Sequence, residues 1–249
     1  MFKTWSLRLS LGLISLIIIG LFTAPAQLLE SQLTTQISGL KTTAATGRFV
    51  SGEFKQLQYK NTTLNQVTWN LSLLSLLTAN IGADINIDDP LFKGQLFIQQ
   101  GVSGSTSISD VNATQSLVEI AKNYNPLKLL RPKGAIEWNA FALSFDNQSF
   151  KQAEGEILWQ NAQIEFNGNP FILGTIKLSP SVENGELFLH ITSDANLELE
   201  GVIKVNRNRT YNLSASIKED LPANIFNAVR FFARPNGNGR LEMTMSRRW

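Results

Sequence analysis

The chain has 249 residues, of which 43% are hydrophobic and 17% are charged, and its formal net charge is +2. The two excess positive charges, Lys3 and Arg8, precede the first acidic residue, so the rest of the chain is neutral and lacks the basic surface of a nucleic-acid-binding protein. There is no cysteine, which excludes disulfide bonds and thiolate metal sites, and a single histidine argues against a zinc site.

The N-terminal segment has the form of a membrane-targeting sequence. Residues 1–8 are basic, and residues 9–22 are an uncharged run of Leu, Ile, Gly, Ser and Phe. We predict that residues 9–26 are a transmembrane signal anchor, because with their interfacial ends they approach the ~20 residues that span a bilayer. Cleavage near Ala24-Pro25-Ala26 is the alternative, since this triplet has the small-x-small form of a cleavage site. In both cases residues 1–8 stay cytoplasmic and the remaining chain is exported.

The exported part is predicted to be one domain preceded by a linker. Residues 27–46 are polar and threonine-rich, and they fit either a helix that leaves the membrane or a spacer. We assign residues 27–46 as the linker and residues 47–249 as a β-rich domain. A single domain of this size is ordinary for an all-β protein.

Short runs of alternating apolar and polar residues dominate the domain. Four such runs lie within residues 155–205, separated by turn residues. Alternation indicates strands with one buried face, and closely spaced turns join antiparallel neighbours. Because there is no βαβ rhythm, the sequence predicts a mainly β fold. We expect an antiparallel meander of about ten or more strands, barrel-like or curled into a trough, with two or three short helices and the N-terminal transmembrane helix.

Three segments of the domain are predicted to be helical. Residues 112–124 and 221–233 have short apolar stripes at helical spacing, and residues 71–77 (Leu-Ser-Leu-Leu-Ser-Leu-Leu) suit a single helical turn. We expect residues 71–77 to be buried in the core, because exposed apolar patches are rare on soluble surfaces. Their leucines could equally face a partner or a lipid.

The predicted strand over residues 134–145 departs from simple alternation. Trp138 lies an odd number of positions before Phe141, Leu143 and Phe145. In a regular strand these residues would therefore lie on both faces. This pattern predicts a strand that is central or covered on both sides.

No cluster of catalytic residue types is found. His190 lies mid-strand without a motif around it, and a Ser-His-Asp triad would have to use it. Asp88 and Asp89 precede a proline and predict a turn, because a calcium loop needs several oxygen ligands at defined spacing. We therefore predict no catalytic, cofactor-binding or metal-binding residue and a protein that is not an enzyme. A secreted hydrolase that uses His190 is the least favoured of the three functions considered; the other two are given below.

A succession of short motifs, each weak alone, runs through the second half of the chain. In order they are residues 134–138 (Gly-Ala-Ile-Glu-Trp), 155–162 (Gly-Glu-Ile-Leu-Trp-Gln-Asn-Ala), 173–178 (Leu-Gly-Thr-Ile-Lys-Leu), 185–187 (Gly-Glu-Leu), 197–201 (Leu-Glu-Leu-Glu-Gly), 211–213 (Tyr-Asn-Leu), the 221–233 helix and 239–241 (Gly-Arg-Leu). As an ordered set, they resemble protein N of the bacterial type II secretion system (the GspN family). The resemblance covers most of the exported part and is strongest over residues 134–245.

The resemblance implies a non-enzymatic accessory component of the type II secretion system, which takes part in the export of folded proteins across the outer membrane. It implies a single-pass protein of the cell inner membrane in a Gram-negative bacterium, with the bulk of the chain in the periplasm and no cofactor. Its partners would be the other secretion subunits, in the inner-membrane platform and the secretin. An edge strand or residues 71–77 would offer the contact surface.

The alternative belongs to a different class. It is an inner-membrane-anchored periplasmic protein that binds or transfers lipid in an AsmA-like β trough. A curled sheet with a continuous apolar concave face could hold acyl chains. Abundant inward Leu, Ile and Phe suit this alternative, and they suit an ordinary core equally.

Overall fold

The computed structural model describes most of the chain. The described residues are 19–20, 22–60, 62–123, 131–166, 168–193, 198–206, 208, 210–221, 226, 229–230 and 233–248.

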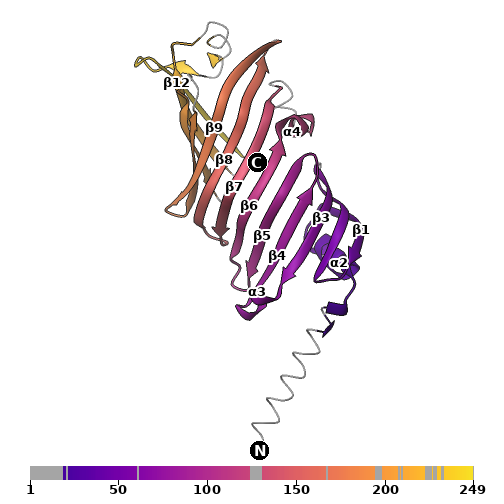
Figure 1. Cartoon of the computed structure of the whole chain (residues 1–249). Helices are drawn as coiled ribbons and strands as arrows, with labels where there is room; N and C mark the ends of the chain where they lie inside the picture. The colour runs from indigo at the N-terminus through magenta and orange to yellow at the C-terminus, as the bar shows by residue number, and fades with distance from the viewer. Residues whose placement is uncertain are drawn as a thin grey trace, which may run out of the picture.

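A single antiparallel sheet of 14 strands dominates these residues (Figure 1). Each strand pairs with the next one along the chain, except at the C-terminal end, where β14 lies between β12 and β13. The predicted antiparallel meander of ten or more strands is confirmed. The strands are β1 (Leu40–Gly47), β2 (Ser51–Tyr59), β3 (Thr62–Ser72), β4 (Asn80–Asp88), β5 (Phe92–Gly101), β6 (Thr106–Ser116), β7 (Lys133–Phe145), β8 (Phe150–Phe166), β9 (Asn169–Glu183), β10 (Glu186–Ser193), β11 (Glu200–Asn206), β12 (Thr210–Lys218), β13 (Arg234–Pro235) and β14 (Arg240–Arg248).

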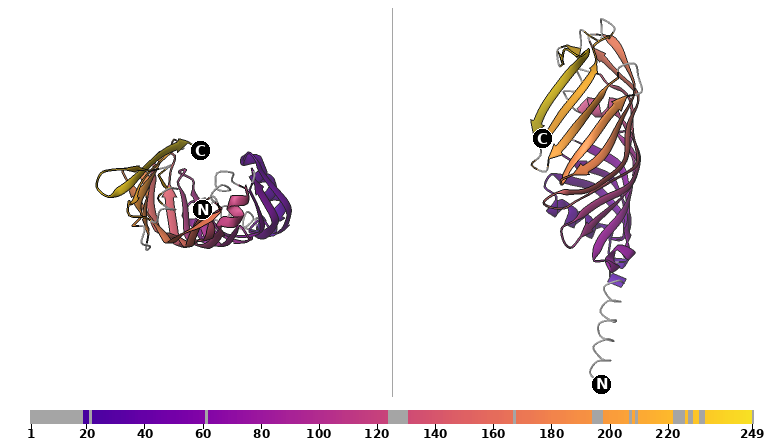
Figure 2. Two further views of the ribbon diagram at one scale, coloured as in Figure 1. Left: turned by 90° about the horizontal axis from the view of Figure 1, so that it is seen from above. Right: turned by 90° about the vertical axis from the view of Figure 1, so that its left-hand side faces the viewer.

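The sheet is open. Within the described part of the chain, no pairing joins β1 to β13 or β14. Seen end-on, the strands form a curve that is open on one side (Figure 2, left). Of the two predicted forms, the structure therefore has the curled trough and not the closed sheet.

Three helices lie among the described residues: α2 (Ala26–Gln36), α3 (Leu73–Leu77) and α4 (Leu117–Asn123). α2 packs on the sheet near β1, where Ala26 joins a buried cluster with Phe54 and Trp69. It lies behind β1–β3 in Figure 1, and α4 lies inside the curve of the sheet in Figure 2. Both helices are thus on the concave side.

The N-terminal part contains the helix that was one of two alternatives for residues 27–46, and its sheet begins before residue 47. No helix among the residues that the structure describes is long and apolar enough to cross a membrane, and most of the predicted anchor (residues 9–18 and 21) lies outside those residues. Residues 27–46, predicted as a linker, contain most of α2 and begin β1, so the sheet starts at Leu40. An isolated bridge joins Pro25 to Arg48 at the turn after β1.

β-bulges keep the apolar side chains of the long strands on one face. The pairing of β7 with β8 shifts between Asn139 and Ala142, and Ala140 has a φ of 46°. The irregularity reverses the alternation, so Trp138 and Phe141 lie on the same face, with their rings edge to face and 5.1 Å between centroids. The prediction that the apolar residues of this strand occupy both faces is wrong for this reason. Similar shifts between β5 and β6, β6 and β7, and β8 and β9 bend the strands and help to curl the sheet.

Two predicted helices have different outcomes. The first begins at Leu117 and not at residue 112, because residues up to Ser116 belong to β6. Pairing with β7 outweighs the local helical spacing there, and Asn112 Oδ1 accepts a hydrogen bond from the backbone N–H of Ala140 in the β7 bulge (3.1 Å). Most of the second predicted helix, residues 221–233, lies outside the described residues.

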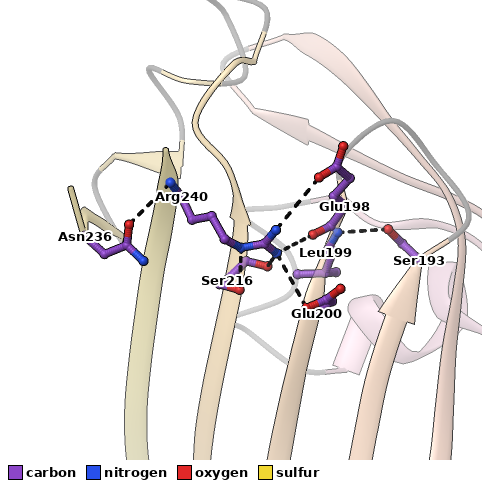
Figure 3. A network of polar contacts seen from close by, with 7 residues as sticks. All are labelled: Ser193, Glu198, Leu199, Glu200, Ser216, Asn236 and Arg240. Carbon is purple, nitrogen blue, oxygen red and sulfur yellow. Dashed lines mark hydrogen bonds and ion pairs between the residues drawn. The ribbon is translucent and has the colours of Figure 1, made fainter. Parts of the chain in front are cut away.

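Arg240 ties β14 to β12 and β11 at one end of the sheet (Figure 3). Its guanidinium donates hydrogen bonds to Ser216 Oγ (3.0 Å) and to the backbone carbonyl of Glu198 (2.7 Å). It also lies 3.8 Å from the carboxylate of Glu198 and 3.9 Å from that of Glu200. These contacts join two of the short motifs noted in the sequence, residues 197–201 and 239–241.

Further bonds fix the turns beside Arg240 (Figure 3). The backbone N–H of Leu199 donates to Ser193 Oγ (3.2 Å). Asn236 Oδ1 accepts from the backbone N–H of Arg240 (3.4 Å), and its amide donates to Glu242 (2.8 Å). The last long strand is therefore held in register by a polar network on the convex face.

We expect Arg240→Ala to lower the free energy of unfolding by roughly 1–2 kcal/mol, because it removes a donor from several acceptors at once. For a chain of this size the melting temperature falls by about 2–4 °C per kcal/mol. Thermal unfolding followed by circular dichroism measures the change. Arg247→Ala, on the same strand and exposed, is the control and should change stability by less than about 0.5 kcal/mol. Equal effects of the two substitutions would show that the network does not hold β14.

Candidate functional site

The concave face of the trough is a continuous apolar surface. Residues that pair across neighbouring strands point to the same face, so the strand register identifies which side chains adjoin. One row runs from β7 to β10 and a second from β10 to β14. They consist of Trp138, Ile157, Leu178 and Ile191, and of Leu189, Ile203, Leu213 and Met245.

The cover over this face is uneven. Near β1, α2 covers the sheet, and Phe54, Val67 and Trp69 are buried. Toward β14, Ile203 and Leu213 are only half-buried, and Met245 is 38% exposed. On the same face Leu187, Ala215 and Leu241 are buried, so the exposure is confined to part of the β10–β14 region. An apolar surface of this extent and partial exposure is suited to an apolar ligand or partner.

A hollow of about 460 Å³ lies beside α4. Its lining is both apolar and charged, and consists of Val118, Ala121, Lys122, Arg131, Pro132, Lys133 and Glu165. Arg131 forms an ion pair with Glu165 (2.7 Å).

α3 has an inverted pattern of burial. Its leucines, Leu73, Leu74, Leu76 and Leu77, are 39%, 76%, 45% and 83% exposed, whereas Ser75 between them is buried. Burying a leucine stabilises a fold by roughly 2 kcal/mol, so four exposed leucines forgo a considerable amount of burial. The prediction that residues 71–77 are buried in the core is wrong for the leucines of α3.

Ser75 is buried because it packs against a glycine of β4. A Cβ at Gly82 would collide with Ser75 Oγ, so the close approach of α3 requires glycine at this position. Ile81 at the start of β4 is 59% exposed, and Val102 in the turn after β5 is 84% exposed. The Val102 N–H donates to the carbonyl of Ala79, which brings this turn against the end of α3 (3.3 Å). We call Leu73, Leu74, Leu76, Leu77, Ile81 and Val102 the α3 tip.

The convex face is polar and carries cross-strand ion pairs. Lys177 Nζ lies 2.6 Å from the carboxylate of Glu156, and Lys204 Nζ lies 2.7 Å from that of Glu186. The hydrogen bond from Lys177 holds the pKa of Glu156 below its usual range. Opposite charges paired across strands suit a face that stays in water.

His190 lies on this convex face. It is exposed, and its Nε2 lies 3.0 Å from Ser181 Oγ on the neighbouring strand. Among the described residues, no carboxylate hydrogen-bonds the imidazole, so this pair has no third member to orient the ring as a triad would. The pair instead bridges β9 and β10 on a flat surface.

The predicted Asp88–Asp89 turn is confirmed between β4 and β5. Asp89 is buried and accepts hydrogen bonds from the backbone and side-chain amides of Asn65 (2.9 and 2.6 Å) and from the backbone N–H of Leu91 (2.7 Å). Its carboxylate therefore stabilises the turn. In the part of the chain that the structure describes, no three His, Cys, Asp or Glu residues group as metal ligands would.

Comparison with known proteins identifies the family of the chain. The family model for type II secretion system (T2SS), protein N, matches residues 38–244, which include nearly the whole sheet. A curated relative is type II secretion system protein N of Vibrio cholerae serotype O1 (strain ATCC 39315 / El Tor Inaba N16961). It is 24% identical over 232 residues, 87% of this chain and 87% of the relative. No solved structure matches the chain. The chain belongs to the family of type II secretion system protein N.

Proposed function

We propose that this protein is a non-enzymatic accessory subunit of the type II secretion system and takes part in the export of folded proteins across the outer membrane. Family membership supports the assignment to this system. The uncharged run over residues 9–22, preceded by basic residues, supports a single-pass anchor in the inner membrane with the sheet in the periplasm. The observation that carries a subunit-binding role is the free edge of β14.

β14 offers an edge to which another strand can be added. β13 pairs only with Leu241 and Glu242 of β14. Within the described residues, the outer edge from Met243 to Arg248 has no neighbouring strand. Unpaired backbone donors and acceptors on a sheet edge recruit strands from other chains.

The direction of the free N–H groups follows from the hydrogen bonds of Arg240. Its N–H and C=O both bond to Asn236, on the outer side of β14. Because this direction alternates along a strand, the N–H groups of Thr244 and Ser246 also point outward. Both residues are exposed, so a partner strand can reach them.

The opposite edge of the sheet is partly occupied by α2. The Gln27 amide donates to the backbone carbonyl of Ala45 in β1 (3.1 Å), and the Thr42 hydroxyl donates to Glu30 (2.6 Å). These contacts use polar groups of β1 and place α2 beside it. β14 is therefore the better candidate for strand addition.

We expect a photo-crosslinking amino acid at Thr244 to capture another secretion subunit in cells. The same group at Ser214, its cross-strand neighbour on β12, should capture severalfold less, because Ser214 lies one strand in from the edge. Ser246→Pro removes an outward N–H without removing a bond to β12, so it should weaken capture from Thr244. Ser246→Val keeps the N–H and should not. Mass spectrometry of the crosslinked bands identifies the partner.

Two results would contradict edge-strand binding. One is equal capture from Thr244 and Ser214. The other is capture from Thr244 that Ser246→Pro and Ser246→Val leave equally unchanged.

Lipid binding is a second candidate function, and the half-exposed concave face favours it. The two apolar rows cross β7–β14, and no charged residue stands at any of their paired positions. Trp138 lies in this face, and its buried indole N–H has no acceptor among the described residues. A trough with such a lining can hold acyl chains along its length.

For this second function, the full chain extracted from membranes in mild detergent should carry phospholipid in a fixed molar ratio. Ile203→Asn, on the concave face, should reduce that ratio severalfold because it places an amide among the apolar rows. Val202→Asn, one residue earlier on the convex face, is the matched control and should not. Lipid extraction and mass spectrometry measure the ratio. Wild-type protein without stoichiometric lipid would exclude this function.

A further inference from the structure

The α3 tip is uncharged over both of the segments that form it. Residues 71–83 and 98–109 contain no Asp, Glu, Lys or Arg. The tip presents Leu74, Leu77 and Val102 at 76%, 83% and 84% exposure, the most exposed large apolar residues of the described chain. Protein surfaces in water rarely gather such residues, so the tip is expected to meet a non-aqueous environment.

The polar side chain of α3, Ser75, is turned away from this surface, and the residues after it bond to the backbone. Ser75 is buried against β4, and the Thr78 hydroxyl donates to the Ser75 carbonyl (2.9 Å). The Asn80 amide donates to the Thr78 carbonyl (2.9 Å). The backbone at the end of α3 is thus partly satisfied from within, which reduces the cost of taking the tip out of water.

The α3 tip lies at the end of the sheet from which the N-terminal segment departs. The Phe49 N–H, in the turn after β1, donates to the carbonyl of Ala24 (2.8 Å). The neighbouring Val50 carbonyl accepts from the N–H of Leu71, two residues before α3 (2.7 Å). The turn after β1 therefore contacts both Ala24 and Leu71, which leads into α3. This turn and α3 lie at the lower end of the sheet in Figure 1.

We propose that the α3 tip inserts into the boundary between headgroups and acyl chains of the membrane that holds the N-terminal segment. This inference rests on the proposed inner-membrane anchor. Ala24, which follows the uncharged apolar run of residues 9–22 closely in the sequence, is bonded to this end of the sheet, so the membrane proposed to hold that run is the apolar phase nearest to the tip. The apolar face of an interfacial helix is buried about 5–10 Å into the boundary between headgroups and acyl chains, a depth that a single helical turn can reach.

Insertion gives the trough a fixed orientation. An anchor that joins the sheet through one segment leaves the sheet free to rotate about that segment. A second contact through the α3 tip holds the long axis of the trough at a set angle to the membrane. The opposite end of the sheet, where Arg240 lies, is then directed away from the bilayer.

The natural absence of cysteine allows a direct test with single-cysteine variants of the full chain. Leu77→Cys, Val102→Cys and Ile172→Cys are each labelled with the fluorophore NBD. The proteins are reconstituted in vesicles of phosphatidylethanolamine and phosphatidylglycerol. Ile172 is the matched control, because it is apolar and 75% exposed. It lies near the start of β9, at the end of the sheet opposite to the α3 tip. Quenching by lipids with a nitroxide on the acyl chain measures depth.

We expect severalfold stronger quenching at residues 77 and 102 than at residue 172. Leu74→Ser combined with the residue 102 label should weaken that quenching without loss of folding, because Leu74 is exposed. Because no other protein is present, strong quenching can come only from contact of the label with lipid. Quenching at residues 77 and 102 no stronger than at residue 172 would overturn the proposal and would point to a protein partner for the tip.

A label at Phe22→Cys separates this inference from the proposed anchor. Strong quenching at residue 22 with none at residues 77 and 102 would overturn insertion of the tip and leave the anchor intact. Absence of quenching at all of these positions would overturn the anchor, and the inference with it.

Discussion

The structure depends on one constraint: successive strands direct their apolar side chains to the same face of one open sheet. A shift of one residue in a strand would place its apolar side chains in water. The bulge at Ala140 prevents this in β7, where it returns Phe141 to the face of Trp138. The same irregularities bend the strands, so one device keeps the concave face apolar and curls the sheet around it.

Much of the fold could be predicted from the sequence, because alternation and turn residues are local signals. The antiparallel meander follows from them. The bulge at Ala140 could not be predicted, since it depends on pairing between β7 and β8 and has no local motif. The predicted helix starts too early because residues 112–116 (Asn-Ala-Thr-Gln-Ser) are mostly polar and carry no strong local signal for strand or helix, and pairing with β7 makes them part of β6.

The candidate surfaces were only partly predictable. An edge strand was expected to bind partners, but the identity of the free edge depends on β13, which covers only Leu241 and Glu242 of β14. Burial of the α3 leucines was expected from their hydrophobicity. Their exposure follows instead from the contact of Ser75 with Gly82, which fixes the orientation of the helix. The absence of charge from residues 71–83 was the local signal for an unusual surface.

The central claim is that a partner strand completes the sheet at β14 in the assembled secretion apparatus. Hydrogen–deuterium exchange of residues 241–248, measured for the isolated protein and for the assembled apparatus, tests it most directly. The account predicts slower exchange on assembly at the outward N–H groups of Thr244 and Ser246, with little change in β12, whose N–H groups are already paired on both sides. Identical exchange of residues 241–248 in the two samples would contradict it.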